Sequence, residues 1–89
     1  MFEDQIAKGV EYLDQDLGPS WFERIDLQQL EMEDCFRCVI GQLYSDFWKK
    51  LNFELGDSLG FSTWTEGGYE LLTQEWKARI SQLRTERAN

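Results

Sequence analysis

Residues 34–51 read DCFRCVIGQLYSDFWKKL, and this stretch decides the fold that the sequence predicts. Its large apolar residues recur at the spacing of one helix face: Phe36, Ile40, Leu43, Phe47 and Leu51. An apolar stripe with this period is typical of a helix that packs one side on a core. We therefore expect a continuous central helix over residues 34–51, with Asp34 as its N-cap.

The opposite face of this expected helix carries only small residues, Cys38, Gly41 and Ser45. A glycine inside a helix costs about 1 kcal/mol relative to alanine. A close approach of another backbone at Gly41 would explain why it is there. The neighbour is either a helix of the same domain or a second copy of the chain, so these three residues are also a candidate dimer face.

The central helix is expected to pack between two others. The first runs over residues 3–17, because its apolar residues share one face and Gly18-Pro19 follows as a stop signal. The last begins at Glu66 or Tyr69 and ends at Arg84. The glycine-containing linker 52–68 also holds apolar residues, so we expect it to pack on the body of the domain.

The predicted fold class is therefore all-α: a small single-domain helical bundle of three main helices plus short helical turns. Short turns are expected after Ser20 and Asp26, which are both good caps. The domain covers residues 1–84, and residues 85–89 are expected to be a frayed C-terminal tail. A chain of 89 residues is long enough for one domain.

Charge narrows the classes of partner. The net charge is −8, and residues 1–34 hold ten acidic and two basic residues. Direct nucleic-acid binding needs a basic surface, and anionic membranes repel acidic proteins, so both are disfavoured. A partner protein with a basic surface is favoured. The sequence has no apolar run of membrane-spanning length and no export signal, so we expect a cytoplasmic protein.

The two cysteines, Cys35 and Cys38, form the only motif with potential site chemistry. A zinc site needs about four ligands, and the chain has no histidine and no second cysteine pair. A redox pair needs a stabilised thiolate, which the nearby acids Glu31, Glu33 and Asp34 oppose. We expect two structural thiols, with a redox role left open. No catalytic residue, cofactor or metal is predicted.

Several stretches resemble a group of small acidic proteins of unknown function from actinobacterial phages and prophages. The resemblance covers about residues 10–84. It is carried by Trp21, Ile25-Asp26-Leu27, Leu30, the run from Cys38 to Tyr44, Leu59-Gly60-Phe61 and Trp76. It implies a phage or prophage origin, and it implies no activity and no catalytic residue.

Together these features favour a non-enzymatic interaction protein that binds a host cytosolic protein, with inhibition as one outcome. Three aromatic anchors and five steering acids are expected to carry the contact: Tyr12, Trp21, Trp48, Asp4, Glu11, Asp14, Glu31 and Glu33. Two alternatives stay open. One is a DNA mimic that inhibits a nucleic-acid-binding enzyme, and the other is a structural homodimer.

Overall fold

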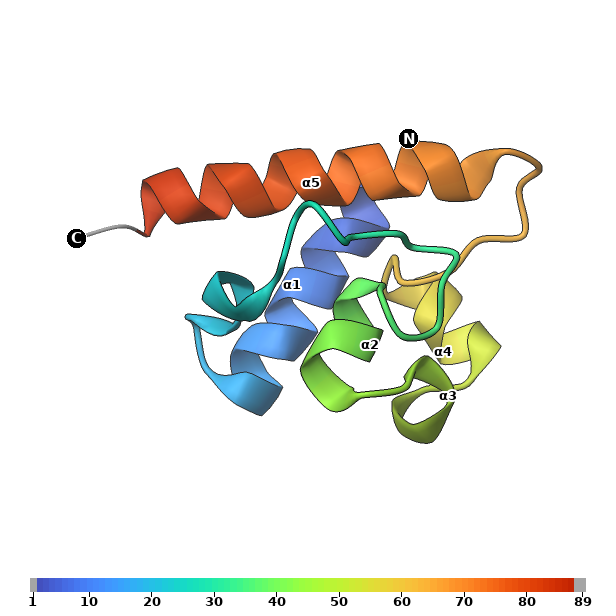
Figure 1. Cartoon of the computed structure of the whole chain (residues 1–89), viewed down its shortest axis with the longest axis horizontal. Helices are drawn as coiled ribbons and strands as arrows, with labels where there is room; N and C mark the ends of the chain where they lie inside the picture. The colour runs from blue at the N-terminus through green and yellow to red at the C-terminus, as the bar shows by residue number, and fades with distance from the viewer. Residues whose placement is uncertain (1, 88–89) are drawn as a thin grey trace.

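Two long helices frame the molecule, and short helical segments lie between them. The computed structural model describes residues 2–87, which form helices and loops and contain no strand. In chain order the elements are α1 (Glu3–Leu17), η1 (Trp21–Arg24), α2 (Val39–Tyr44), α3 (Phe47–Lys50), α4 (Phe53–Ser58) and α5 (Gly68–Glu86). Figure 1 shows α5 along the long axis, α1 crossing beneath it, and α2, α3 and α4 on the same side of α5. The all-α prediction is confirmed for this part of the chain.

The two long helices form where their sequence patterns predict them. α1 has the expected bounds, and Gly18 follows it with φ 89°, a backbone conformation that glycine adopts without strain. α5 buries Leu72, Trp76, Ile80 and Leu83 on one face, as expected. It runs on to Glu86, beyond the predicted end at Arg84. The last two residues of the predicted tail 85–89 lie outside the described residues.

The prediction of one continuous helix over residues 34–51 is wrong. Residues 34–37 form a non-helical turn, and the rest divides into α2 and α3. The expected core face is correct for Ile40, Leu43, Phe47 and Leu51, which are all buried. Phe36 is the exception, because it lies in the turn with 65% of its surface exposed. The third main helix of the predicted bundle is therefore replaced by short segments.

Polar side chains that bind the backbone explain these breaks. Asp34 Oδ1 accepts hydrogen bonds from the N–H groups of Phe36 and Arg37, which closes a local turn in place of a helix. Ser45 ends α2 with a positive φ of 81°. Asp46 then caps α3 by accepting from the N–H of Trp48 at 3.1 Å. A pattern of apolar residues cannot detect such caps, because they depend on side-chain geometry.

Gly41 makes its close approach within the chain. A Cβ atom added there would lie 2.4 Å from the carbonyl oxygen of Cys35 and 2.6 Å from the carbonyl carbon of Phe36. The turn therefore folds back directly over α2, and the N–H of Phe47 donates to the same Cys35 oxygen at 3.0 Å. Cys38 is also buried, so two of the three residues of the candidate dimer face are covered by the chain's own atoms. Only Ser45 is exposed.

The core is centred on aromatic side chains from α5, η1 and the segment after α4. Trp76 is fully buried, and its indole N–H donates to the carbonyl oxygen of Gly60 at 2.6 Å. Its ring stacks on Phe61 at 5.2 Å and meets the edge of Trp21 at 6.3 Å. Large aromatic side chains remove much apolar area from water, which suits a domain this small.

The segment between η1 and α2, which we name the crossing segment, passes in front of α1 and reaches the lower edge of α5 in Figure 1. Leu30 and Met32 of this segment are buried. The N–H of Met32 donates to Thr73 Oγ1 at 2.9 Å, and this hydrogen bond is buried. The segment is therefore fixed against α5, together with the acidic residues on either side of Met32.

Candidate protein-interaction surface

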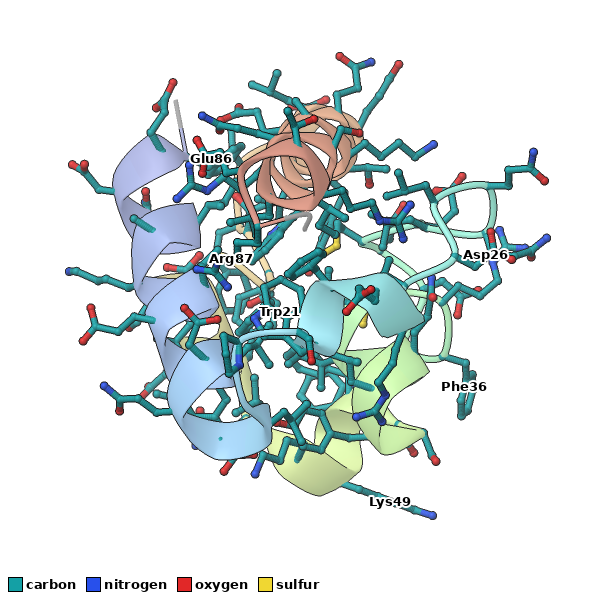
Figure 2. The ribbon with its side chains drawn as sticks, turned by 90° about the vertical axis from the view of Figure 1, so that its left-hand side faces the viewer. Trp21, Asp26, Phe36, Lys49, Glu86 and Arg87 are labelled. Carbon is teal, nitrogen blue, oxygen red and sulfur yellow. The ribbon has the colours of Figure 1, made fainter. Side chains whose placement is uncertain are left out.

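Two of the predicted contact residues, Trp21 and Asp14, belong to an internal cluster. Trp21 is 1% exposed, and its indole N–H donates to Asp14 Oδ1 at 2.9 Å. Arg87 donates to both carboxylate oxygens of Asp14, at 2.8 and 3.0 Å. Figure 2 shows Trp21 inside the molecule, with Arg87 between α1 and α5. Trp21 is therefore not a surface anchor, because η1 turns it into the core, and Asp14 is occupied by partners of its own.

We expect Asp14→Asn to lower the free energy of unfolding by about 1–2 kcal/mol at neutral pH, because Arg87 loses its ionised partner. The hydrogen bonds from Arg87 hold the pKa of Asp14 below its ordinary value. This contribution is therefore present above the unfolded pKa of about 4 and is lost as the pH falls through the lower folded pKa. Urea unfolding of both proteins should show a stability gap at neutral pH that closes in acid. A gap that does not change with pH would contradict this role.

Tyr12, a third predicted contact residue, is half-buried in a cluster that joins α1 to α2 and α3. Its ring meets the edge of Phe61 at 6.5 Å, and the ammonium group of Lys50 lies 5.7 Å from its centre. Lys50 also pairs with Asp16 at 3.2 Å. The hydroxyl of Tyr44 donates to Asp16, and this hydrogen bond lowers the pKa of the Asp16 carboxyl. Tyr12 thus has a structural role here, with part of its ring left accessible.

The other predicted steering acids are all exposed, but they lie on two different parts of the fold. Asp4 and Glu11 are on α1, whereas Glu31 and Glu33 are on the segment that crosses α5. Figure 2 shows α1 and the segment around Asp26 on opposite sides of α5. These acids do not form a single acidic face.

Trp48, the remaining predicted anchor, is 57% exposed and stands at the edge of a cavity of about 70 Å³. We name this cavity the aromatic pocket. Its lining includes four partly exposed or exposed side chains, Cys35, Trp48, Phe53 and Tyr69, and the buried rings of Phe47 and Phe61. Glu33 contributes the one carboxylate of the lining. The pocket forms because α3, α4 and the start of α5 converge on the turn before α2.

Two further aromatic side chains are exposed, and one of them packs on a residue that lines the aromatic pocket. Trp64 is 78% exposed and packs on Phe53, with the ring centres 4.0 Å apart. Phe36 follows Cys35 directly and, as Figure 2 shows, points away from the body of the molecule. Exposed aromatic rings that gather around a hollow are typical of binding surfaces, whereas isolated ones are ordinary.

A second hollow, of about 410 Å³, lies next to the aromatic pocket, between the crossing segment and α5. We name it the acidic groove. It shares Glu33 and Tyr69 with the aromatic pocket and adds Glu31, Glu70, Thr73, Gln74 and Lys77. The acidic groove is thus lined by the carboxylates of three glutamates and by one ammonium group, that of Lys77. Burial, with a smaller contribution from the charge of Glu33, raises the pKa of Tyr69.

Cys38 has a structural role. Its sulfur accepts a hydrogen bond from the N–H of Gly41 at 3.2 Å and so caps α2. Burial raises the pKa of its thiol to about 11, which disfavours the thiolate that redox chemistry requires. Cys35 is only half-buried and lines the aromatic pocket. Within residues 2–87, no cluster of three or more acidic or cysteine side chains could hold a metal ion.

We expect iodoacetamide to alkylate Cys35 in the folded protein and to leave Cys38 unmodified, because Cys38 is buried and its thiol is protonated. Peptide mapping by mass spectrometry, with and without denaturant, distinguishes the two thiols. Equal modification of both thiols under native conditions would contradict the buried cap.

Phe53 and Trp64 were not expected on a contact surface. Both lie in the linker 52–68, whose apolar residues we expected to pack on the body, as Phe61 does. The residues around Trp64 are the one indication in the sequence that its side chain is exposed. Trp64 stands between polar residues in the stretch Ser62-Thr63-Trp64-Thr65-Glu66, and glycines occupy the positions three and four residues after it.

No helix within the described residues is long and apolar enough to cross a membrane. The comparisons with protein-family models, curated proteins and solved structures found no match to this chain.

Proposed function

We propose that this chain is a non-enzymatic, acidic interaction protein of phage origin that binds a basic surface of a host cytoplasmic protein. The observation that supports this proposal is the exposure of Trp48, which lines the aromatic pocket, and of Trp64, which packs on the pocket residue Phe53. Binding energy at protein interfaces concentrates on such residues. The net charge of −8 would steer a basic partner toward the chain.

A protein partner is favoured over the DNA-mimic alternative by the placement of the acids. Asp14, Asp16 and Asp34 form ion pairs with Arg87, Lys50 and Arg37. Duplex DNA as long as the 38 Å molecule would carry roughly 22 phosphates. The net charge is well below that number, and the exposed acids are divided between two sides of α5. If duplex DNA competed with this chain for a captured partner, the DNA-mimic alternative would be favoured instead.

The test is affinity capture from a lysate of an actinobacterial host, followed by mass spectrometry. The unchanged chain serves as the bait and is compared with the double variant Trp48→Ala, Trp64→Ala. The control is Leu71→Ala, which removes an exposed apolar side chain from α5. We expect a partner that the bait and the control retain and the double variant loses. Elution by about 0.5 M salt would show the electrostatic contribution. Equal capture by all three proteins would contradict this surface, and no capture at low salt would contradict the proposal.

A homodimer is less favoured, because Cys38 and Gly41 are covered by the chain's own turn. Sedimentation velocity at high protein concentration tests this alternative. We expect a monomer of 10.6 kDa. A dimer whose formation depends on Trp48 would place the second copy on the proposed surface.

A further inference from the structure

We infer that the aromatic pocket and the acidic groove form one docking site for an extended basic segment of the partner protein. In this arrangement one apolar side chain of the segment enters the pocket, and the adjoining Lys or Arg side chains lie along the groove. The inference rests on the proposed function and specifies what the partner presents.

The size of the aromatic pocket determines what can enter it. Small-molecule sites usually occupy about 300–1,000 Å³. At about 70 Å³, this pocket accepts the end of one side chain and excludes a cofactor or a drug-sized ligand. Its inner lining, Phe47 and Phe61, is buried and apolar, whereas the one carboxylate of the lining, Glu33, is exposed, so a charged group at the inner end would lose hydration without gaining a partner there. An aliphatic side chain therefore fits the pocket best.

The charge of the acidic groove determines which residues can lie beside the anchor. Glu31, Glu33 and Glu70 line it, and within residues 2–87 no Lys or Arg forms an ion pair with any of them. Other acids of the chain are neutralised internally, as Asp14 is by Arg87. The groove therefore offers unpaired carboxylates to a basic segment, and Arg can bind them with two parallel hydrogen bonds.

The two hollows are adjacent and preformed. Glu33 and Tyr69 belong to both, so a bound segment can pass from one to the other without leaving the surface. The buried hydrogen bond from Met32 to Thr73 fixes the position of Glu31 and Glu33 beside α5. A site that is already ordered costs less conformational entropy to occupy. The ordering cost that remains is that of the bound segment itself, and a short segment keeps this cost small.

The probe is a fluorescein-labelled peptide of one leucine and four arginines, made with the leucine at either end. Its affinity for the full chain is measured by fluorescence anisotropy at low and moderate salt. Two matched peptides serve as controls: one has serine in place of leucine, and the other has citrulline, a neutral isostere, in place of arginine. We expect each replacement to weaken binding by about tenfold or more. Burial of the leucine side chain and pairing of the arginine charges should each contribute at least a tenfold gain in affinity.

Matched variants of the chain locate the site. Trp48→Ala and Glu33→Gln are each expected to lower the affinity for the leucine–arginine peptide by about five- to tenfold. Both side chains are exposed, so neither change should unfold the protein. Glu11→Gln removes an exposed acid on α1 and should change the affinity by less than about twofold. In addition, the bound peptide should protect Cys35 from iodoacetamide, because this thiol lines the pocket.

The outcomes separate this inference from the proposed function. Peptide binding that leaves Cys35 unprotected and is unaffected by Trp48→Ala would overturn the site. The peptide would then bind elsewhere, and the hollow of about 340 Å³ between α1 and α5, lined by Ile6, Ala7 and Ala78, is the next candidate. Changes in backbone amide chemical shifts by NMR on adding the peptide would test it. If no peptide binds while lysate capture still depends on Trp48 and Trp64, the partner is not a linear basic segment and the proposed function stands. If the lysate capture fails as well, both the proposed function and the docking site are contradicted.

Discussion

Trp76→Ala is expected to lower the free energy of unfolding by about 3–5 kcal/mol, the usual cost of truncating a buried tryptophan. The side chain is fully buried, stacks on Phe61 and meets Trp21. Its loss would also leave the carbonyl oxygen of Gly60 without the indole donor. A domain of this size has a total stability of only about 4–13 kcal/mol, so the loss is a large part of the total. Urea unfolding followed by circular dichroism measures the change.

Two other substitutions serve as controls for this measurement. Trp76→Phe keeps one ring in the core and removes the N–H donor and part of the buried volume, so its cost should be intermediate. Trp64→Ala removes an exposed tryptophan and should change the stability by less than about 0.5 kcal/mol. If Trp64→Ala were as damaging as Trp76→Ala, the linker would be packed on the body and the exposed aromatic surface would not exist.

Gly9→Ala is expected to destabilise the fold by about 1–3 kcal/mol, although alanine is normally the better helix former by about 1 kcal/mol. An added Cβ at Gly9 would lie 2.2 Å from the carbonyl oxygen of Leu59, and 3.1 and 3.2 Å from the rings of Phe61 and Trp76. A backbone oxygen cannot move aside as a flexible side chain does. α1 would therefore be displaced from the segment that follows α4, and urea unfolding would show a lower midpoint.

Ala7→Gly in the same helix supplies the matched control. Ala7 is exposed, so this change reports the intrinsic preference for alanine without any steric effect. We expect it to cost about 1 kcal/mol. The two substitutions are opposite in chemistry, yet both should destabilise the protein. A stabilising Gly9→Ala would mean that α1 does not approach Leu59 as closely as the structure shows.

The sequence predicts the long helices well and the middle of the chain poorly. α1 and α5 each have an uninterrupted apolar face, and α1 has a glycine–proline stop, so periodicity alone defines them. Residues 34–51 have the same periodicity, but Asp34, Ser45 and Asp46 interrupt the helix and divide the stretch. Side-chain hydrogen bonds to the backbone depend on atomic positions that no apolar pattern records.

The candidate site could be predicted only in part, for a related reason. Glu31, Glu33 and Trp48 were expected on a contact surface, and they line the pocket or the groove. Trp21 was expected there too, but its indole N–H has a carboxylate partner within the core. Whether a tryptophan faces solvent depends on such tertiary partners, which no local pattern reveals. The same is true of the pocket, since its walls are brought together from five separate segments.

Bonds between the first and last helices have a consequence for how the protein is made. The N–H of Phe2 donates to Glu75, and Arg87 binds Asp14, so both contacts join residues 73 positions apart. Translation runs from the N-terminus, so the apolar face of α1 leaves the ribosome before Trp76 exists to cover it. Native packing must therefore wait until α5 has emerged. A nascent chain halted before Trp76 would therefore lack its native packing and remain open to proteases.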